Sequence, residues 1–163
     1  LEHDASSLPK YDPITGSAGT SYTAAVDPIN KRLVVRYHAS RFAVYDLEEA
    51  AKGKFSAIVD IAQPDGLGVF QGYTAYGQYL YLLDGESYEA SPTLNSYVTT
   101  VDMNTGKVVQ RMLTKAGESL AFREPEGLAI YRTAAGETRL FLGFASGVSG
   151  DRRCNIFYKQ ASF

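Results

Sequence analysis

Apolar residues are concentrated in short runs that are bounded by polar or turn residues. The three densest runs occupy residues 33–35, 80–83 and 140–142. Short continuous apolar runs with turn residues on both sides are typical of β-strands that are buried on both faces. A further strand pattern follows each run, at residues 42–46, 97–102 and 155–158. The pattern therefore predicts antiparallel β-sheet over most of the chain.

The strand pattern repeats. Ser21, Gln71 and Glu126 occupy matching positions in short strands ahead of the apolar runs, 50 and then 55 residues apart. A β-rich repeat of that length indicates the four-stranded blades of a β-propeller. Propellers have about 4–8 blades, so three blades do not close a ring. We expect an all-β chain with blades at about residues 14–63, 64–120 and 121–163, which belong to a larger, five- or six-bladed ring.

The fourth strands differ between the repeats. In the second repeat, residues 107–113 follow a hairpin turn at residues 102–106, which contains Asn and Gly. In the first repeat, residues 47–53 predict one or two helical turns that end at a glycine, ahead of a fourth strand at residues 55–61. The third repeat shows no fourth strand.

We therefore expect residues 1–13 to form an outer strand or a linker from an upstream half that completes the ring. The first and last blades would expose apolar faces and unpaired strand edges, which favour association. The expected partner is that upstream half or another copy of the chain.

Composition excludes several classes of protein. Apolar residues make up 45% of the chain and aromatic residues 12%, which is typical of a globular domain. The net charge is −2 and neither half is strongly basic, which argues against nucleic-acid binding. No apolar run approaches the ~20 residues that span a bilayer. One cysteine, Cys154, excludes an internal disulfide and a cysteine-based zinc site, and we expect it to be a buried or half-buried structural residue.

Candidate ligand contacts gather where the loops that enter the inner strands of a propeller would converge. Arginines bind phosphate through a bidentate fork, and aromatic faces stack on sugars or polyols. The candidate ligand-binding residues are Arg36, His38, Arg41, Gln71, Tyr73, Arg123, Glu124, Glu126 and Arg152.

Some of these residues could have a catalytic role or a structural one. Glu124 and Glu126 resemble an acid–base pair, but pairing with Arg123 or with backbone donors explains them equally well. His38 fits a hydrogen-bonded loop residue better than a general base. No histidine pair, nucleophile elbow or complete calcium loop is present in the sequence. The sequence therefore favours a binding protein over an enzyme, without a metal or another cofactor.

Three segments carry a family resemblance. Residues 70–82, 97–102 and 122–131 resemble the second half of the family known as teichoic acid biosynthesis protein C, whose β-propeller also occurs in staphylococcal phage receptor-binding proteins. Residues 141–153 are similar to secreted actinobacterial-type members, and the resemblance covers about residues 8–160. It implies a longer protein with further upstream blades, exported to the cell envelope, that recognises polyol-phosphate or glycan polymers.

The sequence thus predicts a secreted, cell-envelope β-propeller that binds an anionic, teichoic-acid-like wall polymer or a surface glycan. One alternative is a hydrolase or lyase that acts on such a polymer through His38, Glu124 or Glu126. The other is a scaffold that binds another protein.

Overall fold

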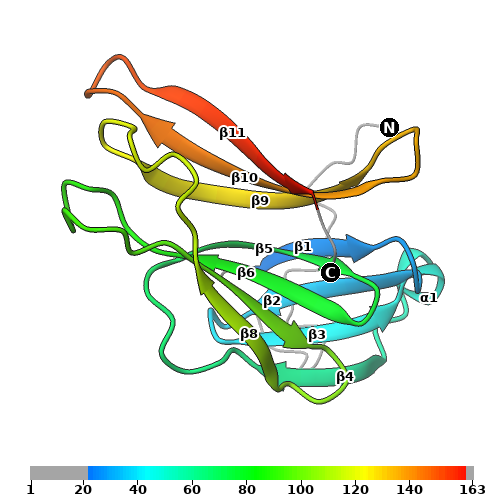
Figure 1. Ribbon diagram of the computed structural model, residues 1–163. Helices are drawn as coiled ribbons and strands as arrows, with labels where there is room; N and C mark the ends of the chain where they lie inside the picture. The colour runs from blue at the N-terminus through cyan, green and yellow to red at the C-terminus, as the bar shows by residue number, and fades with distance from the viewer. Residues whose placement is uncertain (1–21, 161–163) are drawn as a thin grey trace. The chain divides into compact units, whose positions relative to one another are not determined.

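The structure is a computed structural model, and residues 22–160 are described (Figure 1). It divides into two compact units, residues 1–63 and 64–163, and each is described by itself. Within the described residues the fold is all-β apart from one short helix, with three antiparallel sheets. Ser21 and the outer strand or linker expected at residues 1–13 lie outside the described residues.

Unit 1 contains one four-stranded sheet in the order β1-β2-β3-β4. Its elements are β1 (Tyr22–Asp27), β2 (Arg32–Tyr37), β3 (Arg41–Asp46), α1 (Leu47–Ala51) and β4 (Ala57–Ala62). Every neighbouring pair is antiparallel. The side chains that pack its core are those of Val35, Tyr37, Ala43, Tyr45 and Ala50.

The helical insertion predicted between the third and fourth strands is confirmed as α1. The Asp46 carboxylate accepts a hydrogen bond from the backbone N–H of Glu49 at 2.9 Å, which caps the first turn. At the other end Gly53 has a φ of +79° and donates its N–H to the Ala50 carbonyl. A glycine in this left-handed conformation ends the helix, as the sequence predicts.

Unit 2 contains two sheets. The first has the order β5-β6-β7-β8, with β5 (Phe70–Tyr76), β6 (Tyr79–Asp84), β7 (Tyr97–Asp102) and β8 (Val108–Leu113). The predicted turn between β7 and β8 is present. The Asp102 carboxylate accepts hydrogen bonds from the next backbone N–H groups, which gives it a turn-forming role.

The second sheet of unit 2 has three strands within the described residues, in the order β11-β10-β9. They are β9 (Glu124–Arg132), β10 (Thr138–Ser146) and β11 (Arg153–Gln160). Along β10 buried Leu140 and Leu142 alternate with half-buried Phe141. Within residues 22–160 one face of the sheet packs against the β5–β8 sheet, so this run is buried on that face, and burial of its outward face stays a prediction.

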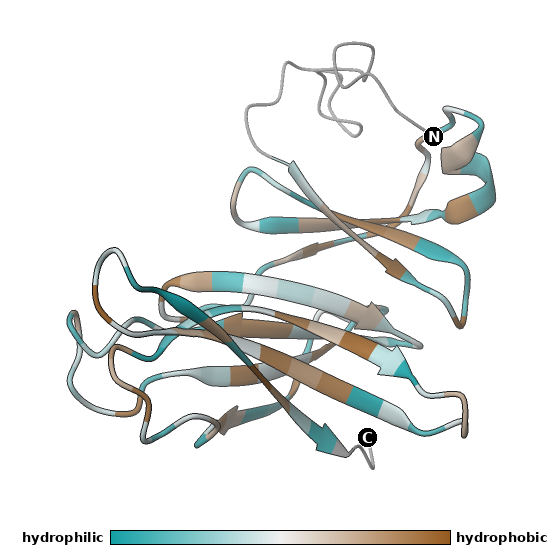
Figure 2. Cartoon of the chain, turned by 90° about the horizontal axis from the view of Figure 1, so that it is seen from above, coloured by the Kyte–Doolittle hydropathy of each residue, from teal (hydrophilic) through white to brown (hydrophobic). Residues whose placement is uncertain are grey.

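The two sheets of unit 2 pack face to face through their inner strands. A Cβ atom added to Gly72 on β5 would lie 3.4 Å from the Cα atom of Gly127 on β9, so the two backbones approach closely. Apolar residues are spread along the strands of each sheet (Figure 2). The buried side chains that join the sheets are those of Leu83, Leu140, Leu142 and Phe144. The equivalent inner strands of two successive repeats thus lie beside each other.

Tyr81 on β6 is 3% exposed, and burial raises the pKa of its phenol to about 12. Because the pKa is higher in the folded chain than the value near 10 in the unfolded chain, the neutral phenol favours folding. This contribution is fully present below pH 10 and is lost as the pH rises through 12. The free energy of unfolding, measured in urea, should fall between pH 9 and pH 11.5. In Tyr81→Phe this fall should be smaller than in the wild type by roughly 2 kcal/mol. Tyr131→Phe, at an exposed tyrosine, should keep the wild-type profile, and equal profiles for all three proteins would contradict the assignment.

Candidate binding site

Three loops of unit 2 meet at one end of its sheets, and we call this the loop-bearing end. They are residues 85–96 between β6 and β7, residues 114–123 between β8 and β9, and residues 147–152 between β10 and β11. The middle loop forms backbone hydrogen bonds with each of the other two. The Phe122 carbonyl accepts the N–H of Tyr88 at 2.7 Å, and the Ala121 carbonyl accepts the N–H of Gly147 at 3.0 Å.

The matching positions Gln71 and Glu126 both lie near this end, each directly before one of the two glycines at the inner-strand contact. The Gln71 side chain donates to the Gly85 carbonyl at 2.9 Å, so it also fixes the first loop. Tyr73 is half-buried on the same strand, with its ring 6.2 Å from that of Phe70. These residues are brought together as the repeat predicts, and their contact with a ligand stays a prediction.

Glu124 is half-buried and Glu126 is exposed on β9. Neither carboxylate has a hydrogen-bond or ion-pair partner in the described part of the chain, so the suggested pairing with Arg123 is not present. Two exposed or half-exposed carboxylates remain free to accept hydrogen bonds from a ligand.

Arg123 is a structural residue, which corrects its prediction as a ligand contact. Its side chain is 0% exposed, and its guanidinium donates to the carbonyls of Ala116 at 2.9 Å and Thr114 at 3.0 Å and to the Ser96 hydroxyl at 2.8 Å. The guanidinium also lies 4.4 Å from the ring centre of Phe144. Burial lowers the pKa of this guanidinium. Arg123 therefore ties two loops to the sheet from inside.

A second buried cluster, which the sequence analysis did not identify, supports the same end. Asp84 is 0% exposed and forms a bidentate ion pair with Arg111, both bonds at 2.7 Å. Arg111 also donates to the Thr99 hydroxyl at 2.6 Å, and Asp84 accepts the backbone N–H of Gly68 at 2.5 Å. The bonds to Asp84 raise the pKa of Arg111. A signal was present in the sequence, since Arg111 interrupts an apolar strand and Asp84 ends one.

Arg152 is exposed at the loop-bearing end, as a ligand-binding arginine should be. Its guanidinium lies 3.2 Å from the ring centre of Phe122 and donates to the Gly147 carbonyl. Phe122 itself has a φ of +75°, an uncommon conformation for a residue with a side chain and one that is frequent at functional sites. The loop backbone thus places an aromatic ring beneath an exposed arginine.

Arg152 also borders a pocket of about 250 Å³. The pocket lies on the β9–β11 sheet and is lined by Glu126, Ala145, Arg152, Arg153 and Cys154. It combines two cationic side chains with one carboxylate. An anionic group and a hydroxyl group of one ligand would both find partners there.

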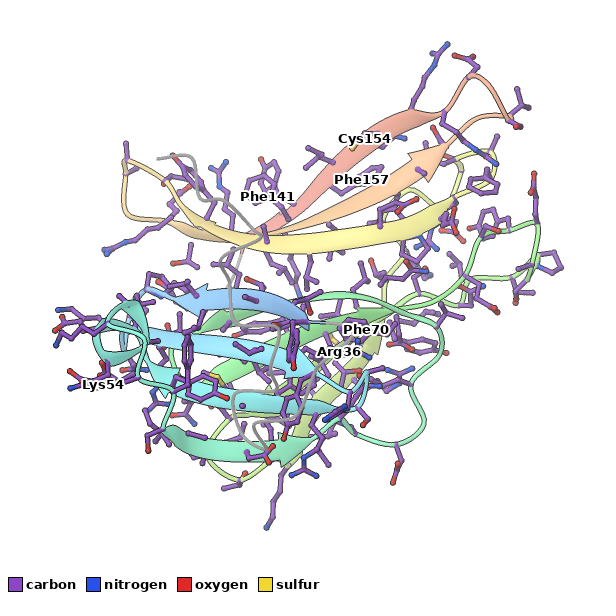
Figure 3. The ribbon with its side chains drawn as sticks, turned by 180° about the vertical axis from the view of Figure 1, so that it is seen from behind. Arg36, Lys54, Phe70, Phe141, Cys154 and Phe157 are labelled. Carbon is purple, nitrogen blue, oxygen red and sulfur yellow. The ribbon has the colours of Figure 1, made fainter. Side chains whose placement is uncertain are left out.

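The three candidates of unit 1 lie at and beside the β2–β3 turn. Arg36, labelled in Figure 3, comes from β2. It donates to the Gln63 amide oxygen at 2.8 and 3.0 Å, and Arg41 pairs with Asp60 at 3.0 Å. His38 is exposed with a φ of +48°, and its ring lies 5.2 Å from that of Tyr37. The two arginines hold the β2–β3 turn against β4 and the residue directly after it. A ligand role for all three stays a prediction.

Cys154 lies exposed on β11, opposite Ala145, so the prediction of a buried or half-buried cysteine is wrong (Figure 3). The reason is that β11 is an edge strand whose outward face has no covering element within the described residues. Among residues 22–160 no cluster of three or more His, Cys, Asp or Glu side chains is placed to hold a metal ion. No helix in that range is long and apolar enough to span a membrane.

Comparisons with known proteins give a consistent result. Residues 3–158 match the family described as the phage 5-bladed beta propeller receptor binding platform domain. The chain is 29% identical over 149 residues to a Bacillus subtilis (strain 168) protein that bears the name major teichoic acid biosynthesis protein C, covering 83% of the chain and 33% of that protein. It also resembles the tail fiber of Staphylococcus aureus phage P68, with a TM-score of 0.79 and 19% identity over 99% of the chain and 33% of the fiber. The chain thus spans about a third of each relative, and the resemblance seen in its sequence is confirmed.

Proposed function

Because the chain belongs to the family of phage five-bladed β-propeller receptor-binding platform domains, we propose that it binds a component of a bacterial cell surface. The proposed ligand is an anionic wall polymer of the teichoic-acid type or a surface glycan, and the proposed place of action is outside the cell at the envelope. The name of the Bacillus subtilis relative supports a wall polymer. The fold alone does not establish a ligand, so the argument depends on the site.

The observation that carries the proposal is the pocket beside Arg152. The Phe122 ring and the Gly147 carbonyl hold the Arg152 guanidinium in place, which lowers the entropy lost when it binds a phosphate. Arg153 adds a second cation, since its pair with Asp151 is long at 3.4 Å and exposed. Glu126 accepts hydrogen bonds from hydroxyl groups. A polymer of alternating phosphodiesters and polyols or sugars presents both kinds of group.

Replacing Arg152 and Arg153 together with alanine should weaken binding to purified wall teichoic acid by about tenfold or more, because charge-assisted hydrogen bonds to phosphate are lost. Both side chains are exposed, so the melting temperature should stay close to that of the wild type. Binding is measured by biolayer interferometry on immobilised polymer, and it should weaken as ionic strength rises. Arg132→Ala, at the other end of β9, is the matched control and should bind as the wild type does.

The same assay separates the other functions. If the polymer is cleaved, and Glu126→Gln or His38→Ala abolishes cleavage with folding intact, the protein is a hydrolase or lyase. If neither binding nor cleavage of any wall polymer or glycan occurs, a protein-binding scaffold replaces the proposal. Gln71, Tyr73, Glu124, Arg36 and Arg41 are proposed as further ligand contacts, with no metal or other cofactor.

We also propose that the chain contributes three blades, at about residues 14–63, 64–120 and 121–163, to a ring that an upstream half or a second copy completes. The support is the part of the outward face of the β9–β11 sheet that lies away from the loop-bearing end and its Arg152 pocket. Tyr131, Ile156 and Tyr158 are each more than half exposed on this face, beside the ring of Phe141. A contiguous exposed apolar face of this kind marks an interaction surface.

A further inference from the structure

Unit 2 contains a larger cavity, distinct from the Arg152 pocket. It is a groove of about 400 Å³ between the β5–β8 sheet and the β9–β11 sheet. This volume falls in the ~300–1,000 Å³ range of small-molecule sites. The groove shares no residue with the Arg152 pocket. A ligand of the groove would therefore bind at a different place from the proposed surface polymer.

Two rows of side chains line one wall of the groove. Thr100 and Gln110 pair across β7 and β8 and form a polar row. Val98 and Met112 pair one step closer to the loop-bearing end and form an apolar row. The opposite wall consists of Leu140, Leu142 and Lys159, and Leu140 and Lys159 are direct partners on β10 and β11. The groove thus combines apolar side chains on both walls with polar side chains and an ammonium group.

The charges of the lining have one sign. Lys115 and Lys159 line the groove, and none of its lining residues, all of which lie within the described range, is acidic. Neither ammonium group has a hydrogen-bond or ion-pair partner in that range. This contrasts with the net charge of −2 of the whole chain. An apolar ligand with a negative group would bury its chain against the leucines and satisfy an ammonium group.

We propose that this groove binds an anionic amphiphile, with its hydrocarbon chain between Val98, Met112 and Leu142 and its phosphate or carboxylate group at Lys159. Apolar contact supplies most of the binding free energy, since about 25 cal/mol is gained per Å² of apolar surface removed from water. The ammonium group of Lys159 selects the sign of the headgroup, and Thr100 and Gln110 add neutral donors to the same lining.

The chain contains two methionines, which provide a reporter and its control. Met112 lines the groove and is 40% exposed, whereas Met103 is 0% exposed and lies outside the lining. The full chain, labelled with ¹³C in the methionine methyl groups, is titrated with decyl phosphate below its critical micelle concentration. The Met112 methyl resonance should shift with saturation while that of Met103 stays in place. Inorganic phosphate alone should shift neither.

Charge reversal tests the headgroup. Lys159→Glu should weaken decyl phosphate binding by about tenfold, because a hydrogen bond to a charged group is lost. The same variant should bind decyltrimethylammonium more tightly than the wild type does. Lys107→Glu, at the exposed turn before β8, should behave as the wild type. Arg152→Ala should keep decyl phosphate binding, which separates this site from the surface-polymer site.

Three results would overturn the proposal. They are an unshifted Met112 resonance, joint shifts of both methionines that indicate non-specific unfolding, and equal affinity of the wild type for the anionic and cationic amphiphiles.

Discussion

Arg123→Ala should lower the free energy of unfolding of unit 2 by about 3–4 kcal/mol, the loss expected when several buried acceptors are left unpaired and a cavity opens. The guanidinium satisfies two backbone carbonyls and the Ser96 hydroxyl while it stacks on Phe144. Urea unfolding followed by circular dichroism measures the loss. The melting temperature should fall by roughly 12–32 °C, at about 4–8 °C per kcal/mol for a unit of about 100 residues.

Two further variants show what the guanidinium contributes. Arg123→Met keeps the apolar stem against Phe144 and removes every donor, so it should lose most of the same stability. Arg132→Ala removes an exposed arginine from the strand that follows Arg123 and should change stability by less than about 0.5 kcal/mol. Wild-type stability of Arg123→Met would show that apolar packing, and not hydrogen bonding, holds the loops.

Asp84→Asn should cost about 3 kcal/mol, the lower end of what is found when one partner of a buried ion pair is removed. Asp84 is fully buried, whereas the side chain of Arg111 is 28% exposed, and water reaching that arginine limits the loss. The new amide also places N–H donors where Gly68 and Arg111 both need an acceptor. Thermal and urea unfolding measure the effect.

The matched control is Asp65→Asn, an exposed aspartate in the segment before β5, which should leave stability nearly unchanged. A double-mutant cycle with Arg111→Gln isolates the pair. We expect the sum of the stability losses of the two single variants to exceed the loss of the double variant by about 2 kcal/mol, because either change alone already breaks the ion pair. Additive losses would mean that the two residues act independently.

The local pattern of the sequence predicts most of the fold. Apolar runs, the glycine at residue 53 and the turn after Asp102 act through neighbouring residues, so the strands, α1 and the β7–β8 hairpin can be read directly. The sequence does not show on how many faces β10 is buried, because the same apolar run occurs whether one or both faces of its sheet are covered. Blade number and ring closure depend on polypeptide beyond the described residues and stay predictions.

The site is harder to predict for a related reason. Position in the repeat brings Gln71 and Glu126 to neighbouring strands, but it does not show which way an arginine points. Arg123 turns inward because the left-handed backbone at Phe122 and Arg123 redirects the chain just before β9. Arg152 remains outside, above the aromatic ring that the same turn presents. Two arginines in loops of similar composition therefore differ in exposure, one buried and one exposed, and only tertiary contacts distinguish them.

The exposure of Cys154 gives the chain a natural attachment point for a spectroscopic label. It is the only cysteine in the sequence, and it lines the Arg152 pocket from an edge strand. A maleimide dye would therefore couple at a single position without any prior removal of other thiols. Its emission would report directly on the surroundings of Arg152 and Arg153, so the proposed binding at this pocket can be tested by fluorescence in solution.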